Sequence, residues 1–239
     1  MKNKTNHDFD MLIGGPNRDS DRPLSALRND RYIDIPGLDG SLHRSGNLQM
    51  MTFTVYFVCK AKTSERWFQQ RNKIAAWLHT EDEVEIRVDD EPGIHYKGKV
   101  TQFEIPTKYD SGVTFSAEFT VQPFRFKNKR NIDVDSYESS RFYVANEGNY
   151  DADYILIADV EEDSNIFSIA VGDSRLTYRA PVSFGDRVTI DTAKKELRLN
   201  GNLKVLELSG TFSKLQPGDN ILSVSADSYI NMNLQEVFI

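Results

Sequence analysis

The residues whose spacing is most suggestive of chemistry are carboxylates. Four of them match positions 1, 3, 9 and 12 of an EF-hand calcium loop: Asp151, Asp153, Asp159 and Glu162. Such a loop needs glycine at its sixth position for a sharp turn, and Leu156 stands there. The intervening Tyr-Ile-Leu-Ile of residues 154–157 predicts a strand instead of a loop. We therefore expect no calcium site in this segment.

Two further acidic groups interrupt the chain at predicted turns. The first comprises Asp89, Asp90 and Glu91 at the tip of a hairpin, and the second comprises Glu161, Glu162 and Asp163. Nothing near either group indicates a raised pKa or a paired acid and base, as general acid–base catalysis would need. Both are expected to be solvated turns.

Histidine and cysteine are equally uninformative for catalysis. The four histidines are scattered, without the i, i+4 pairs or Cys/His clusters of zinc sites: His7, His43, His79 and His95. The single cysteine, Cys59, ends the apolar run Val55–Cys59, which predicts a buried structural thiol. Gly14-Gly15 lacks the Gly-Lys-Ser/Thr of a phosphate loop, and no Gly-x-Ser-x-Gly motif occurs. We predict no catalytic, cofactor-binding or metal-binding residues, no cofactor, and no enzyme activity.

The elements around these residues are mostly strands. A short strand is predicted over 32–35, with turn signals over 36–40, and a long strand over 49–59. An amphipathic helix follows, with Thr63 or Ser64 as N-cap. Its apolar stripe recurs at helical spacing: Trp67, Phe68, Ile74, Ala75 and Leu78. Alternating apolar and polar residues then predict strands at 84–88, 94–100 and 113–121. One amphipathic helix packed on a sheet is the expected first domain.

The second part reads as short strands separated by turns. The polar stretch 127–140 is taken as the boundary, which gives an N-terminal domain of residues 1–132 and a C-terminal domain of residues 133–239. The latter has at least six predicted strands and no helical pattern, which indicates a β-sandwich. They are 141–145, 153–158, 166–171, 187–190, 196–199 and 221–226. The fold class is therefore mainly β in two domains.

Composition excludes several classes of function. Of the net charge of −7, −1 falls in residues 1–140 (20 basic minus 21 acidic) and −6 in residues 141–239 (9 minus 15). An acidic chain without a basic stripe is a poor candidate for specific nucleic-acid binding, but it can line a channel through which DNA slides. No signal peptide and no apolar run of about 20 residues is visible, so we expect no membrane insertion and synthesis in a cytoplasm.

A polar segment near the N-terminus lacks periodicity. Residues 14–31 are expected to be an unanchored arm that a neighbouring subunit orders. Strand-rich chains must also protect their sheet edges, and assembly can turn those edges into interfaces.

The order of motifs resembles the distal tail protein family of long-tailed phages and prophages of Gram-positive bacteria. In the first part the motifs are Ile35–Gly40 before the long strand, Ile74–Leu78 at the helix end, the acidic turn 89–93 with His95–Val100, and Pro123–Phe126. In the second part they are Val144–Asn149, Val188–Thr192 and Gly210–Asn220. The departures are small: Leu38 stands where an arginine is frequent, and residues 14–31 are not distinctive.

The resemblance implies a hexameric ring at the tail tip, with the N-terminal domains as a central belt. The ring continues the tail tube and lets DNA pass through its centre. One face meets the tail-tube protein and the other the tail-associated, often lytic, tip protein. It also implies that the C-terminal domain is galectin-like and projects outward, where receptor-binding or baseplate proteins dock. The protein would then be located at the distal tail tip of the virion, and in the host cytoplasm during assembly.

Two rival functions follow from the same sequence. A galectin-like sandwich suggests a carbohydrate-binding adhesin, but the residues that commonly stack on sugars, Trp67 and Trp77, both lie on the predicted helix of the first domain. A cell-wall hydrolase ranks third, because no catalytic constellation is present.

Overall fold

The computed structural model describes residues 11–13, 21–61, 63–88, 91–104, 106–109, 112–135 and 141–239, and the side chains of 11–13 and 135 are not described. The protein is mainly β, as the sequence predicts. It divides into two compact units, residues 1–125 with Ile239, and residues 126–238. The division falls ahead of residue 132 because a strand over Arg130–Asp135 pairs along its length with the second unit.

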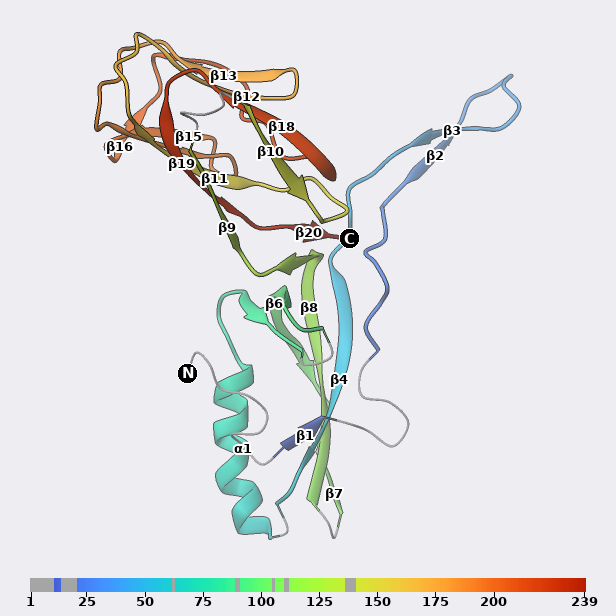
Figure 1. Ribbon diagram of the computed structural model, residues 1–239. Coiled ribbons are helices and arrows are strands. Elements are labelled where there is room, and N and C mark those ends of the chain that lie inside the picture. Colours follow the sequence, from blue (N-terminus) through green and yellow to red (C-terminus); the bar gives the residue numbers. More distant parts are fainter. Residues whose placement is uncertain are drawn as a thin grey trace. The chain divides into compact units, whose positions relative to one another are not determined.

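Unit 1 is built on an antiparallel sheet with the strand order β1-β4-β8-β6-β5, and β7 pairs with β8 outside this order. Figure 1 shows α1 lying along this sheet, while β2 and β3 form a separate hairpin. The elements are β1 (Met11–Ile13), β2 (Arg31–Asp34), β3 (Ser41–Arg44), β4 (Met51–Cys59), α1 (Ser64–Leu78), β5 (Val84–Ile86), β6 (Ile94–Phe103), β7 (Thr107–Tyr109) and β8 (Gly112–Lys127).

The core of unit 1 lies between α1 and the inner faces of β4 and β8. Alternate residues of β4 are buried, and they face the alternate residues of β8 that the sequence predicts to share one side. Two aromatic pairs cross these strands, Phe53 with Phe119 at 5.5 Å and Phe57 with Phe115 at 5.2 Å between ring centroids. The period-two pattern thus places one apolar row of each strand in the core.

The helix begins where the sequence predicts, and most of the predicted stripe faces the core. The hydroxyl of Thr63 accepts a hydrogen bond from the Arg66 backbone N–H at 3.2 Å, which caps the first turn. Ile74 and Leu78 are buried and Trp67 packs on Phe115, with ring centroids 6.4 Å apart. Phe68 and Ala75 are exposed, so the predicted stripe is wrong at these two positions. Phe68 lies one position, about 100°, around the helix from Trp67 and therefore leaves the core face. Ala75 follows Ile74 directly and leaves the core face in the same way as Phe68.

Two sheets form unit 2, with the orders β10-β18-β12-β13-β17 and β16-β15-β14-β11-β19-β9. Their inner faces share one apolar core, so the predicted sandwich is observed. The elements are β9 (Arg130–Asp135), β10 (Arg141–Asn146), β11 (Tyr154–Val160), β12 (Phe167–Val171), β13 (Ser174–Tyr178), β14 (Arg187–Asp191), β15 (Glu196–Leu199), β16 (Asn202–Lys204), β17 (Leu208–Gly210), β18 (Gly218–Val224), β19 (Ser228–Leu234) and β20 (Val237–Phe238).

The polar stretch interpreted as a domain boundary contains an edge strand. β9 pairs with β19 from Arg130 to Asp135, and its exposed side chains are hydrogen-bonded across the pair. Asn231 donates to Asp133 and Asn233 donates to Asn131, each at 2.6 Å. One face of β9 is exposed to water and carries polar residues, so the sequence of this strand resembles that of a polar linker.

The prediction of an unanchored N-terminal arm is wrong for the residues that the structure describes. β1 pairs with the edge of β4, and the side chain of Ala26 lies in the core of unit 1. Asp21 exchanges two hydrogen bonds with the backbone of Thr54, at 2.8 and 3.3 Å. Residues 14–20 lie outside the described part of the chain.

Candidate functional site

The carboxylates that resemble a calcium loop are not brought together. Residues 154–160 form β11, along which a residue rises about 3.3 Å, so Asp153 and Asp159 lie about 20 Å apart. Asp159 forms a bidentate ion pair with Arg187, at 2.6 and 2.9 Å, and Asp153 binds Lys214 at 2.8 Å. Among the described residues no group of three metal-ligating side chains occurs.

The histidines and the single thiol are also separate. His43 lies on the exposed β3, 3.1 Å from Asp30, whereas His95 is buried with its Nε2 3.8 Å from Glu85. Cys59 is fully buried, as predicted. Glu91 is not a simply solvated carboxylate, because it accepts a hydrogen bond from the Tyr96 hydroxyl at 2.9 Å. His7, Asp89 and Asp90 lie outside the described residues.

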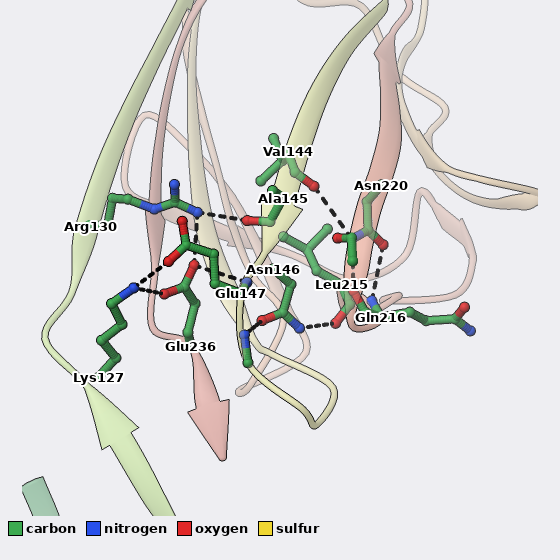
Figure 2. A network of polar contacts seen from close by, with 12 residues as sticks. Lys127, Arg130, Val144, Ala145, Asn146, Glu147, Leu215, Gln216, Asn220 and Glu236 are labelled. Atoms are coloured by element: carbon green, nitrogen blue, oxygen red, sulfur yellow. Dashed lines mark hydrogen bonds and ion pairs between the residues drawn. The ribbon is translucent and has the colours of Figure 1, made fainter. Parts of the chain in front are cut away.

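Unit 2 contains one buried carboxylate that the sequence does not reveal. Glu236 is 2% exposed and receives two cations, Lys127 on Oε2 and Arg130 on Oε1, each at 2.9 Å (Figure 2). The backbone N–H of Glu147 also donates to Oε1 at 3.2 Å. The Glu147 carboxylate and then Glu236 raise the pKa of Lys127, and Lys127 lowers the pKa of Glu147.

This cluster is an ion-pair network with a structural role. Both oxygens of Glu236 bind cations and the side chain is buried, which is the arrangement of a structural ion pair and not that of an accessible general base. Arg130 also donates to the Ala145 carbonyl at 2.6 Å (Figure 2). The network therefore joins the end of β8, the start of β9, the end of β10 and the residues before β20.

Two buried asparagines hold the neighbouring turns (Figure 2). Asn146 donates to the carbonyls of Tyr150 and Leu215, at 2.9 and 3.0 Å. Asn220 donates to the Gln216 carbonyl at 2.8 Å and accepts from the Gln216 N–H at 3.0 Å. Asn146 belongs to the sequence motif Val144–Asn149 and Asn220 to the motif Gly210–Asn220. In both motifs the asparagine side chain stabilises a turn. Buried amides of this kind satisfy backbone groups that would otherwise be unpaired.

The surface that stands out as a candidate interface is the β2–β3 hairpin. Every residue of both strands is exposed, and large apolar side chains are exposed on the strands (Tyr32, Ile33 and Leu42) and on the turn between them (Ile35 and Leu38). Figure 1 shows the hairpin extending beyond the sheet of unit 1. A two-stranded hairpin is marginally stable in water when it lacks a packed face. Such a concentration of exposed apolar groups marks a protein-interaction surface.

The hairpin is attached firmly at its base. Residues 27–30 pair with 46–49 through backbone bonds from Asn29 to Asn47 at 3.0 Å and from Gln49 to Leu27 at 2.8 Å. Gly46 permits this approach, because a Cβ there would lie 1.8 Å from the Asn29 carbonyl oxygen. Asp30 accepts from the Gly46 N–H at 2.8 Å, and this bond, followed by the bond to His43, lowers the pKa of Asp30. The base is fixed while the strands beyond it are presented to solvent.

Sequence reasoning identified only the first strand and the turn of this hairpin. The missed signal is Ser41-Leu42-His43-Arg44, whose alternation mirrors that of Arg31–Asp34 across the turn. Other exposed apolar residues lie apart from the hairpin, such as Phe68 on α1 and Leu203, Val205 and Leu206 around the end of β16. Trp67 and Trp77 pack against the core of unit 1.

Comparisons with known proteins agree with the two-unit organisation. Residues 14–122 match the family described as "Phage tail protein RIFT-related domain", and residues 147–238 match "Siphovirus-type tail component, C-terminal domain". No curated protein matches the chain in sequence. No helix in the described part of the chain is long and apolar enough to span a membrane.

One solved structure shares this fold over nearly its whole length. The Dit (gp 19.1) protein of phage SPP1, described as "a Paradigm of Hub Adsorption Apparatus in Gram-positive Infecting Phages", superposes with a TM-score of 0.81 at 14% identity. The match covers 96% of this chain and 94% of that one. Two structures of the activated baseplate of phage P2, with Ca and with Sr, match with TM-scores of 0.48 at 7% identity, over 92% of this chain and 91% of theirs.

Proposed function

Because the chain belongs to the distal tail protein family of siphophages, we propose that it forms a ring of six copies at the tip of the tail. As a phage tail component with a hub and baseplate role, the protein is part of the virion. The ring connects the tail tube to the tail-tip and host-adsorption apparatus. DNA passes through its central opening. Assembly takes place in the host cytoplasm.

The observation that carries this proposal is the exposed β2–β3 hairpin on a firmly anchored base. A ring requires a heterologous contact, in which one surface of a copy meets a different surface of the next. A projecting hairpin with apolar side chains meets that requirement, because it can reach a neighbour without disturbing its own core. Unit 1 is accordingly the ring-forming belt.

The function is geometric and involves no catalysis. Each contact between copies can be weak, since closure of the ring holds all of them in register at once. The net charge of −7 suits a channel through which DNA slides without sticking. One face of the ring meets the tail-tube protein and the other the tail-associated tip protein. Unit 2, the galectin-like domain, is left for receptor-binding or baseplate partners.

A carbohydrate-binding adhesin remains a weaker alternative. Both tryptophans pack on the core of unit 1, so neither offers a stacking surface on unit 2. Tyr143, opposite Ile221 on β18, is an exposed aromatic residue of the five-stranded sheet. A single tyrosine without a surrounding group of convergent polar side chains gives little support for a sugar site.

The proposed ring can be tested by the assembly state of the purified protein. We expect the purified full-length protein to form closed particles of several copies with a central opening, with six-fold class averages in negative-stain images. Light scattering should give a mass that falls to that of one copy on dilution. Monomers alone at high concentration, with the tail-tip partner also added, would contradict the proposal.

A further inference from the structure

The β2–β3 hairpin has two chemically different faces. Its register pairs Arg31 with Arg44, Tyr32 with His43, Ile33 with Leu42, and Asp34 with Ser41. Directly opposed residues share a face, and successive residues alternate between faces. One face therefore carries Arg31, Ile33, Leu42 and Arg44, which we call the arginine face. The other carries Tyr32, Asp34, Ser41 and His43.

The second face is satisfied by its own side chains. The Ser41 hydroxyl donates to Asp34, and His43 lies 3.1 Å from Asp30. The rings of Tyr32 and His43 are in contact, with centroids 5.1 Å apart. Because the polar side chains of this face already bind one another or Asp30, few of them are available to bind a charged partner.

The arginine face is not satisfied. Arg31 and Arg44 occupy directly opposite positions, where like charges destabilise a strand pair. Neither guanidinium forms a hydrogen bond or ion pair with any residue that the structure describes, and both are exposed. They line a surface hollow of about 350 Å³ together with Asn29, Ser45, Gly46 and Asn47. Two unpaired cations at one hollow form a site for an anion that is absent from the isolated chain.

We propose that Arg31 and Arg44 bind carboxylates of a second copy of this chain, as the polar part of the contact that closes the ring; this rests on the ring proposed above. Guanidinium groups bind carboxylates bidentately and are enriched in protein interfaces. Ile33 and Leu42 on the same face supply apolar contact, which suits a folded protein surface better than a phosphate backbone. The partner surface is therefore acidic and partly apolar.

The chain carries a matching surface in the loop after α1. Glu81 and Asp82 are exposed, and their carboxylates form no ion pair with the described residues. Val84, at the start of β5, is an exposed apolar residue beside them. Residues 81–84 of one copy thus present negative charge opposite to that of the arginine face of the next copy, beside an apolar side chain that can contact Ile33 and Leu42. This gives the head-to-tail contact that a ring needs.

The first test compares assembly of full-length variants. R31Q/R44Q should raise the concentration at which rings dissociate at least tenfold and should flatten the dependence of that concentration on salt. Thermal unfolding of the monomer should be unchanged or slightly higher, since a like-charge pair is removed. The control R71Q/K73Q removes the same charge from exposed positions of α1 and should assemble as the wild type.

The second test identifies the acceptor. Copies carrying R31K/R44K are mixed from ¹⁴N- and ¹⁵N-labelled preparations and treated with a carbodiimide, which joins an amine to a carboxylate in contact. We expect cross-links of mixed isotope composition between positions 31 or 44 and Glu81 or Asp82. Mixed cross-links to another carboxylate would keep the carboxylate site and overturn the match to residues 81–84.

Three results would overturn the proposal itself. They are unchanged ring affinity in R31Q/R44Q, cross-links only within one copy, and wild-type binding of double-stranded DNA that R31Q/R44Q abolishes. The last would assign the arginines to phosphate. Wild-type protein that forms no rings at all would instead refute the proposed function, so the two failures are distinguishable.

Discussion

At the scale of single residues, Glu236 is the clearest case of a charge buried for structure. Its two cations come from Lys127 and Arg130, about a hundred residues earlier in the chain. Removing one member of a buried ion pair leaves the partners with unreplaced hydrogen bonds. Because Lys127 and Arg130 are partly exposed, water compensates for some of the loss.

Glu236→Gln should therefore lower the free energy of unfolding by about 1–3 kcal/mol. Urea unfolding followed by circular dichroism measures this as a lower midpoint with an unchanged slope. Glu162→Gln, at an exposed turn, is the matched control and should leave the midpoint within error. Equal midpoints for the two variants would show that the network around Glu236 contributes nothing.

Acid should weaken unit 2 through carboxylates whose pKa is lowered in the folded state. The Arg187 hydrogen bonds lower the pKa of Asp159, and the Ser183 N–H followed by Asn200 lowers the pKa of Asp186. Their stabilisation is complete above the ordinary aspartate value of 3.8 and is lost as pH falls through the lower folded values.

We thus expect the urea midpoint to fall as the pH drops below about 4, and Asp159→Asn to reduce that fall. Asp173→Asn, at an exposed aspartate without an ion pair, should retain the full dependence. An acid dependence identical in both variants would remove Asp159 from the explanation.

At the scale of elements, the N-terminal segment is part of the fold of unit 1. Ala26 is 8% exposed and packs into the core, whereas the next residue, Leu27, is 74% exposed. Glutamate introduced at each of the two positions therefore distinguishes the effect of burying a charge from the effect of adding one.

Ala26→Glu should destabilise unit 1 by about 2 kcal/mol or more, because it buries an unpaired carboxylate in a packed core. Leu27→Glu should have almost no effect. Trp67 and Trp77 both lie on α1, so tryptophan fluorescence during urea unfolding follows unit 1. If both variants unfold like the wild type, the segment is not held as described.

Strands with one buried face were predictable, and strands defined by their partners were not. The rows of β4 and β8 follow from alternation, and α1 from its cap and period. β9 was missed because the partners of its polar side chains, on β19 and around Glu236, are about a hundred residues away in sequence. Glu236 offered no signal for the same reason. The first strand and the turn of the β2–β3 hairpin were predicted. The exposure of the hairpin was not, because it depends on the absence of tertiary packing, which local sequence does not encode.

At the scale of the whole molecule, family membership and fold agree on a tail structural protein in two units. Charge is divided unevenly, since −6 of the −7 follows residue 140. The opposed cations Arg31 and Arg44 lie on unit 1, in the hairpin. An assembly that brings hairpins onto acidic neighbours therefore relieves the like-charge repulsion that each isolated copy carries.

The sealed position of Cys59 has a practical consequence. It is the only cysteine of the chain and is 0% exposed, so a thiol-reactive dye has no natural target in the folded protein. A cysteine introduced at Leu38, on the exposed hairpin turn, would be labelled alone. One dye per copy at the tip of the hairpin would turn ring closure into an optical signal that can be followed in real time.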